Sequence, residues 1–153
     1  MGRVCCRAQN DDRPFARAAI SAAGPGTGDQ PGQRLLPAAT VNTASINGLI
    51  GNPGQPAYTA SKHGVVGLTR HGALRWAKAG IRVNAVCPGV IETPMTAPLV
   101  ASPEMKAVID SMTPMGRMGR ADEIAAAVVW LCSDAASFVT GHPMVIDGGA
   151  TAI

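Results

Sequence analysis

The stretch IRVNAVCPG occupies residues 81–89 and predicts a strand that leads directly into a loop. Apolar residues stand at every second position, which favours a β-strand: Ile81, Val83, Ala85 and Cys87. Pro88 and Gly89 then end the strand, because Pro-Gly is a common turn and proline lacks the N–H that a sheet needs. In open α/β sheets, ligands bind beyond the carboxyl ends of the strands, so residues 88–98 are a candidate binding loop.

Upstream of this strand, the sequence predicts a strand and a long helix. Residues 40–44 form a short β-branched run that ends at the polar Ser45. After several Gly and Pro residues, the segment 57–79 has apolar residues at helical spacing, and Gly80 stops it. The apolar residues that we expect on one face of this helix are Val65, Leu68, Leu74 and Trp76.

Downstream, the sequence predicts a lid, a helix and a last strand. Residues 94–118 are rich in Met and Pro, with one short helix over 103–111, and we interpret this segment as a mobile lid. The segment 121–132 begins with two acidic residues and has apolar residues on one face, which favours a helix. Residues 143–146 form a strand that ends at Asp147, Gly148 and Gly149.

Strands and helices therefore alternate over residues 41–153. This alternation is typical of βαβ crossovers and predicts an α/β fold with a Rossmann-like, doubly wound parallel sheet. Residues 1–40 are rich in Arg, Ala, Gly and Pro and show no sustained period, so we predict an irregular tail that is either disordered or non-native. Three strands are few for a parallel sheet, which needs cover on both faces, so we expect that strands are missing upstream.

Composition restricts the class of protein. A chain of 153 residues fits one domain, and its net charge of +3 comes from scattered Lys and Arg, which argues against a nucleic-acid partner. No apolar run is long enough to span a bilayer and no secretory signal is present, so we expect a cytoplasmic protein. The four cysteines and three histidines lack the spacing of a disulfide framework or a metal site.

Three residues carry the chemistry that we expect. Tyr58 and Lys62 lie four positions apart in YTASK, so a helix would place them on the same face. A neighbouring ammonium favours the phenolate, which allows a tyrosine to act as an acid or base. Ser45 lies at the end of the first strand, where its hydroxyl could polarise a substrate carbonyl beside the tyrosine.

The Tyr58–Lys62 pair has a less specific explanation, because this spacing also occurs by chance on solvated helix faces. Four motifs in order argue against chance: NTAS at 42–45, YTASK at 58–62, NAVCPGVIETPM at 84–95 and IDGG at 146–149. Each lies where a strand ends or a helix begins. The ordered set favours a catalytic site.

With these motifs, residues 41–153 resemble the second half of a classical short-chain dehydrogenase/reductase. The resemblance implies that Ser45 polarises the substrate oxygen, Tyr58 is the acid/base and Lys62 also binds the nicotinamide ribose. It further implies that a nicotinamide cofactor contacts Pro88, Gly89, Val90, Ile91 and Thr93. The expected cofactor is NAD or NADP, the expected substrate a small alcohol or ketone, and the expected assembly a homo-oligomer, either a dimer or a tetramer.

The sequence also departs from the family pattern. The TGxxxGxG turn and the NNAG strand end are not found before Ser45, and we interpret Gly24, Gly26 and Gly28 as a coincidental match, since no strand precedes them. Three hypotheses follow. The chain is an oxidoreductase, an inactive truncated or frame-shifted fragment, or an interaction module that associates with related subunits through the 57–79 helix and the last strand.

Overall fold

Three parallel strands form the centre of the computed structural model, which describes residues 38–152. They are β1 (Ala39–Thr43), β2 (Arg82–Pro88) and β5 (Pro143–Ile146), in the order β1-β2-β5. In the register, Ala39 is opposite Arg82, and Ala85 is opposite Pro143. Because β2 is central and both of its faces are covered, residues 82–87 are all buried, the polar positions of the alternating pattern included.

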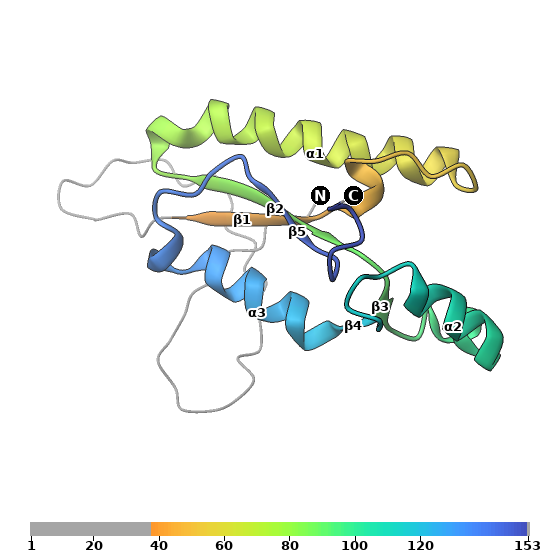
Figure 1. Cartoon of the computed structure of the whole chain (residues 1–153). Coiled ribbons are helices and arrows are strands. Elements are labelled where there is room, and N and C mark those ends of the chain that lie inside the picture. The colour runs from red at the N-terminus through yellow and green to blue at the C-terminus, as the bar shows by residue number, and fades with distance from the viewer. Residues whose placement is uncertain (1–37, 153) are drawn as a thin grey trace.

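A helix covers each face of this sheet (Figure 1). Helix α1 (Pro56–Trp76) connects β1 to β2 and continues as the short η2 (Ala77–Ala79). Helix α3 (Ala121–Cys132) lies on the opposite face and precedes η4 (Asp134–Ala136) and β5. The described residues therefore form the predicted α/β fold, a parallel sheet with helices on both faces.

The face of α1 that packs on the sheet is only in part the predicted apolar face. Val65 packs against the core, but Leu68, Leu74 and Trp76 are 53%, 86% and 40% exposed, so the prediction was wrong for these three. Small and polar residues take their place, and a Cβ built on Gly72 would lie only 3.3 Å from Val83 Cγ1. The helix approaches β2 through its small side chains, and the residues buried on it are Val66, Thr69, Gly72 and Ala73.

The ends of most helices and strands agree with those predicted from the sequence. Gly80 closes the segment after α1 with a φ of 72°, a left-handed conformation that glycine adopts without strain. The predicted helix over 103–111 is α2 (Pro103–Ser111), and Ser102 caps it by accepting a hydrogen bond from the Met105 N–H at 3.1 Å. A short helix, η3 (Ala97–Val100), precedes it.

The sequence did not predict a second, two-stranded sheet that encloses the lid segment. Strand β3 (Ile91–Glu92) pairs in parallel with β4 (Gly119–Arg120), with Ile91 opposite Gly119. The segment from η3 through α2 thus leaves and returns at neighbouring points, so both of its ends are fixed. Strands of two residues have no periodicity that a sequence pattern could detect.

The predicted tail lies almost wholly outside the described residues. Of residues 1–40, only 38–40 are described, and Ala39 and Thr40 begin β1. The glycine run at 24–28 also lies outside, so the irregular tail stays a prediction. None of the helices within residues 38–152 is both long and apolar enough to cross a membrane.

Candidate active site

Tyr58 and Lys62 lie in the first two turns of α1, which begins at Pro56. Proline is favourable there because the first helical N–H needs no partner within the helix. Lys62 Nζ lies 5.4 Å from the centroid of the Tyr58 ring, a distance at which a cation and an aromatic face attract each other. Lys62 Nζ also donates a hydrogen bond to the Thr43 carbonyl at 3.0 Å. Lys62 therefore links the start of α1 to the carboxyl end of β1.

Ser45 lies two residues beyond β1, at the start of η1 (Ile46–Gly48), and is 8% exposed. Its Oγ accepts a hydrogen bond from the Asn47 N–H at 3.2 Å, which fixes the side chain as the cap of η1. Gly48 packs η1 against α1, because a Cβ at Gly48 would lie 2.7 Å from the Lys62 carbonyl oxygen. Ser45 and the Tyr58–Lys62 pair thus lie on two segments in direct contact.

Gly48→Ala is expected to lower the free energy of unfolding by about 1–3 kcal/mol, because the new methyl group meets backbone atoms that cannot move aside without displacing η1. Urea denaturation of the full chain measures the change. Gly51→Ala is the matched control, since a Cβ at Gly51 meets nothing within 4 Å. Equal stability of the two variants would contradict a close contact between η1 and α1.

The loop that follows β2 carries the residues for which the sequence predicts contact with a cofactor. Pro88 ends β2, and the Gly89 N–H donates to the Ile146 carbonyl at 3.0 Å. A Cβ on Gly89 would lie 2.9 Å from the Asp147 Cα, so only glycine permits this approach of the loop to the end of β5. The loop leaves the same edge of the sheet as Ser45, as expected of neighbouring parallel strands.

Thr96 organises this loop, and the sequence analysis did not identify it. Its Oγ1 donates to the Ile91 carbonyl at 2.6 Å and accepts from the Thr93 N–H at 3.0 Å. The same oxygen lies 3.2 Å from Thr93 Oγ1, so it also fixes the hydroxyl of a predicted cofactor-binding residue. The signal was a second threonine three positions after Thr93, a spacing at which hydroxyl groups often bond to nearby backbone groups.

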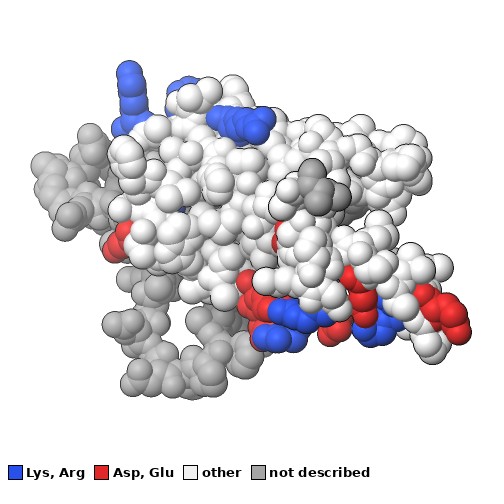
Figure 2. Space-filling view, viewed as in Figure 1, with Lys and Arg blue, Asp and Glu red and all other residues white. Residues whose placement is uncertain are grey.

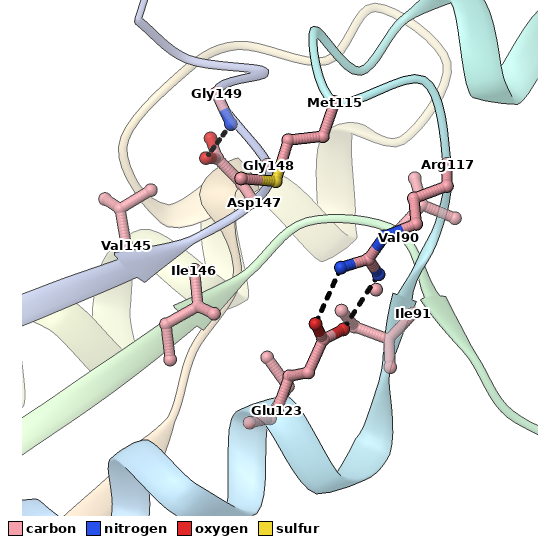
Figure 3. Close-up of a pocket in the computed structure, with 12 residues that line it drawn as sticks. Val90, Ile91, Met115, Arg117, Glu123, Val145, Ile146, Asp147, Gly148 and Gly149 are labelled. Carbon is pink, nitrogen blue, oxygen red and sulfur yellow. Dashed lines mark hydrogen bonds and ion pairs between the residues drawn. The ribbon is translucent and has the colours of Figure 1, made fainter.

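A cavity of about 370 Å³ lies on the α3 side of the loop (Figure 3). Tyr58, Lys62 and Ser45 are not among the residues that line it, so it does not bring the predicted catalytic and cofactor-binding residues together. Arg117 points across the cavity toward Glu123, and Met115 lies beside Asp147. The lining residues are Val90, Ile91, Met115, Arg117, Gly119, Glu123, Ile124, Val145, Ile146, Asp147, Gly148 and Gly149.

Asp147 fixes the turn after β5. Its carboxylate accepts hydrogen bonds from the Gly149 N–H at 2.9 Å, the Thr151 N–H at 2.8 Å and the Thr151 hydroxyl at 2.7 Å. Burial alone would raise the pKa of Asp147, but these hydrogen bonds outweigh it and the pKa is lowered. Asp147 is therefore a carboxylate that holds the IDGG turn, which explains the motif without a catalytic role.

Cys87 lies beneath the site but is not suited to act as a nucleophile. Burial raises the pKa of its thiol, and the hydrogen bond from the Ser45 backbone and the charges of Arg70 and Lys62 offset that effect only in part. The residue packs in a buried cluster with Ala44, Val66 and Ala85. Within residues 38–152, no group of three or more His, Cys, Asp or Glu side chains could hold a metal ion.

The chain is similar to known proteins over most of its length. The family model described as Enoyl-(Acyl carrier protein) reductase matches residues 19–151. A short-chain type dehydrogenase/reductase of Sinorhizobium fredii, y4vI, is 50% identical over 113 residues, which are 73% of this chain and 21% of that protein. The chain belongs to the short-chain dehydrogenase/reductase family. The resemblance predicted from the motifs is thereby confirmed.

Two solved structures with a bound nicotinamide cofactor share the fold. A structure of 4-hydroxyisoleucine dehydrogenase complexed with NADH has a TM-score of 0.75 and 39% identity, covering 77% of this chain and 49% of that one. ElxO with NADP bound has a TM-score of 0.71 and 38% identity, covering 76% of this chain and 47% of that one. The chain thus spans about half the length of these relatives, and one-fifth of y4vI.

Proposed function

We propose that the chain carries the catalytic residues of an oxidoreductase that transfers a hydride between NAD or NADP and an alcohol or ketone. The observation that supports this most is the double contact of Lys62. Its Nζ lies 5.4 Å from the Tyr58 ring centroid and 3.0 Å from the Thr43 carbonyl oxygen. A cation and a phenol thus meet at the carboxyl end of a parallel strand, where α/β folds bind their ligands.

In this proposal Tyr58 moves the proton. It donates the phenol proton to the carbonyl oxygen during reduction and takes a proton from the hydroxyl group during oxidation. The positive charge of Lys62 stabilises the phenolate that forms in between. Ser45 donates a hydrogen bond to the same substrate oxygen; because its Oγ already accepts from Asn47, the orientation of the side chain is fixed and its O–H proton is available.

The loop after β2 is suited to a nicotinamide. The proposed contacts are Pro88 and Gly89, the backbone groups of Val90 and Ile91, the hydroxyl of Thr93 for the carboxamide, and Lys62 and Tyr58 for the ribose. The position of Thr93 supports the carboxamide contact. Its Oγ1 lies 3.2 Å from Thr96 Oγ1, and a hydroxyl that is already fixed binds a ligand with less loss of conformational freedom. When bound, the nicotinamide supplies or accepts the hydride.

The side chains of the predicted lid, residues 94–118, favour an uncharged, moderately apolar substrate. Met105 and Val108 lie on one face of α2, and Met112 continues this face just beyond the last helical residue; they are 49%, 54% and 68% exposed. The charged side chains Lys106 and Asp110 pair with each other on another face, at 2.5 Å. Methionine side chains adapt to apolar molecules of varied shape. We therefore expect neutral alicyclic or aliphatic alcohols to be better substrates than hydroxy acids.

A fluorescence titration of the full chain with NADH and NADPH tests the proposal. We expect saturable enhancement of nicotinamide emission and turnover of neutral alcohols or ketones in the same preparation. Absence of binding by folded protein would contradict it. That outcome would favour a second candidate, a catalytically inactive chain that associates with short-chain dehydrogenase/reductase subunits.

Exposed apolar residues support this second candidate. Leu68 and Leu74 are exposed on α1, and Val129 and Phe138 are exposed on α3 and just beyond it, at 66% and 102%. Contiguous exposed apolar patches often mark protein–protein contacts, and each of these helices offers residues for one. A monomer in size-exclusion chromatography, alone and mixed with an intact relative, would argue against association.

A further inference from the structure

Glu123, in the first turn of α3, contacts the returning end of the lid segment at two points. Its Oε1 accepts from Arg117 Nη2 at 2.7 Å, and its Oε2 accepts from Arg117 Nη1 at 3.0 Å. The same Oε2 also accepts from the Arg120 backbone N–H at 2.7 Å. One carboxylate thus binds a guanidinium in the two-pronged geometry that is strongest for this pair and fixes the backbone of β4 as well (Figure 3).

Strand β4 in turn holds the loop for which we propose contact with the nicotinamide. The Gly119 N–H donates to the Val90 carbonyl at 3.0 Å, and Ile91 pairs with Gly119 in the β3–β4 sheet. The fit is close, because a Cβ on Gly119 would lie 2.6 Å from Ile91 Cδ1. A continuous set of contacts therefore runs from Glu123 through Arg120 and Gly119 to Val90 and Ile91.

The charge state of Glu123 suits this role. The hydrogen bonds from the Arg117 side chain and the Arg120 backbone lower the pKa of Glu123 from 4.5 to about 2, so its carboxylate stays ionised near neutral pH. Acidic and basic side chains gather around α2 and the start of α3 (Figure 2). Among them, Asp122 offers a comparison: its carboxylate accepts from the Arg120 guanidinium at 3.0 and 3.2 Å and is not bonded to Arg117.

We propose that Glu123 is a positioning residue of the nicotinamide loop: it holds β4 in place, and β4 holds Val90 and Ile91. This inference rests on the proposed function, since only the proposed function assigns a nicotinamide to the loop. The role is local. The hydrogen bonds and the ion pair of Glu123 go to Arg117 and Arg120, so its effect on the loop passes through the β3–β4 pair.

Glu123→Gln tests the proposal with two readouts. The first is amide hydrogen exchange of the full chain without cofactor. We expect the Gly119 amide and the 89–93 segment to exchange about tenfold faster. The substitution replaces a charged acceptor by a neutral amide and removes the two-pronged ion pair with Arg117. The second is cofactor affinity, for which we expect weaker binding of NADH and unchanged binding of ADP-ribose, which lacks the nicotinamide.

Asp122→Asn is the matched control, because it removes the same charge from the same helix turn. Asp122 bonds only to the side chain of Arg120, so the hydrogen bond from Glu123 to the β4 backbone stays in place. Arg117→Gln removes the ion pair from the other side and should reproduce the Glu123→Gln result in part. Equal exchange in the Glu123 and Asp122 variants, or an equal loss of NADH and ADP-ribose affinity, would overturn the proposal. The two proposals can fail separately. If the unsubstituted chain binds no NADH, the proposed function fails. If Gly119 exchange is nevertheless faster in Glu123→Gln and not in Asp122→Asn, the role of Glu123 in positioning the loop is still supported.

Discussion

Tyr58→Phe is expected to lower kcat for alcohol oxidation and ketone reduction by about a hundred- to ten-thousandfold, the usual contribution of a general acid or base. The substitution removes one hydroxyl and keeps the ring beside Lys62. The side chain is 44% exposed, so the loss of the hydroxyl leaves the fold unchanged. Initial rates at saturating cofactor and substrate measure the effect.

Two comparisons separate a catalytic role of Tyr58 from a structural one. NADH affinity should fall far less than kcat in Tyr58→Phe, because the substitution removes only one of the proposed ribose contacts and the ring and Lys62 remain. Ser61→Ala is the matched control: Ser61 lies one turn from Tyr58, and its exposed hydroxyl donates only to the Tyr58 carbonyl at 2.7 Å. A Tyr58→Phe variant that keeps more than about one-tenth of the rate would exclude Tyr58 as the acid/base, since a factor of ten lies below the usual contribution.

Local sequence signals were sufficient to predict the elements whose ends are marked by their own residues. Helix α3 begins after Arg120 and runs over 121–132 as predicted, because Asp122 and Glu123 favour a helix start and an apolar period follows them. Helix α2 likewise begins at Pro103 after the Ser102 cap. The three main strands were also predictable, since each ends at a polar or Gly-rich turn. The site at their ends stays a prediction.

The predictions that failed concern features that depend on contacts between distant segments. The pairing of Ile91 with Gly119 joins residues on either side of the lid, and neither strand is long enough to show a pattern. The outward face of α1 was mistaken for its inward face because close packing on β2 favours small residues such as Gly72 over Leu68 and Leu74. The role of Glu123 also depends on such a pairing, that of β3 with β4, and no spacing rule for catalytic motifs includes it. The contacts of Thr96 are local, so the Thr93–Thr96 spacing was a signal for them.

Helix α3 is held at both ends by charged groups, and the end opposite Glu123 is held by a buried arginine. Arg82, at the start of β2, is 7% exposed. Its Nη1 donates to the Leu131 carbonyl at 2.6 Å and its Nη2 to the Ser133 carbonyl at 3.1 Å. These carbonyls lie at the carboxyl end of α3, where helix carbonyls need partners and a positive charge is favourable. Arg82 therefore fixes the far end of the helix that presents Glu123.

Arg82→Met is expected to lower the free energy of unfolding by about 2–4 kcal/mol, because two carbonyl groups lose their donor at the helix end. Part of this loss is offset, since a buried charge with a costly desolvation is removed at the same time. The free energy of unfolding of Arg82→Lys should lie between those of Arg82→Met and the unsubstituted chain, because a single ammonium cannot reproduce the two-pronged geometry of a guanidinium. Urea denaturation of the three proteins gives the values. If Arg82→Met is as stable as the unsubstituted chain, desolvation of the guanidinium cancels its hydrogen bonds, and α3 must be held by its packing on β1 and β2 alone.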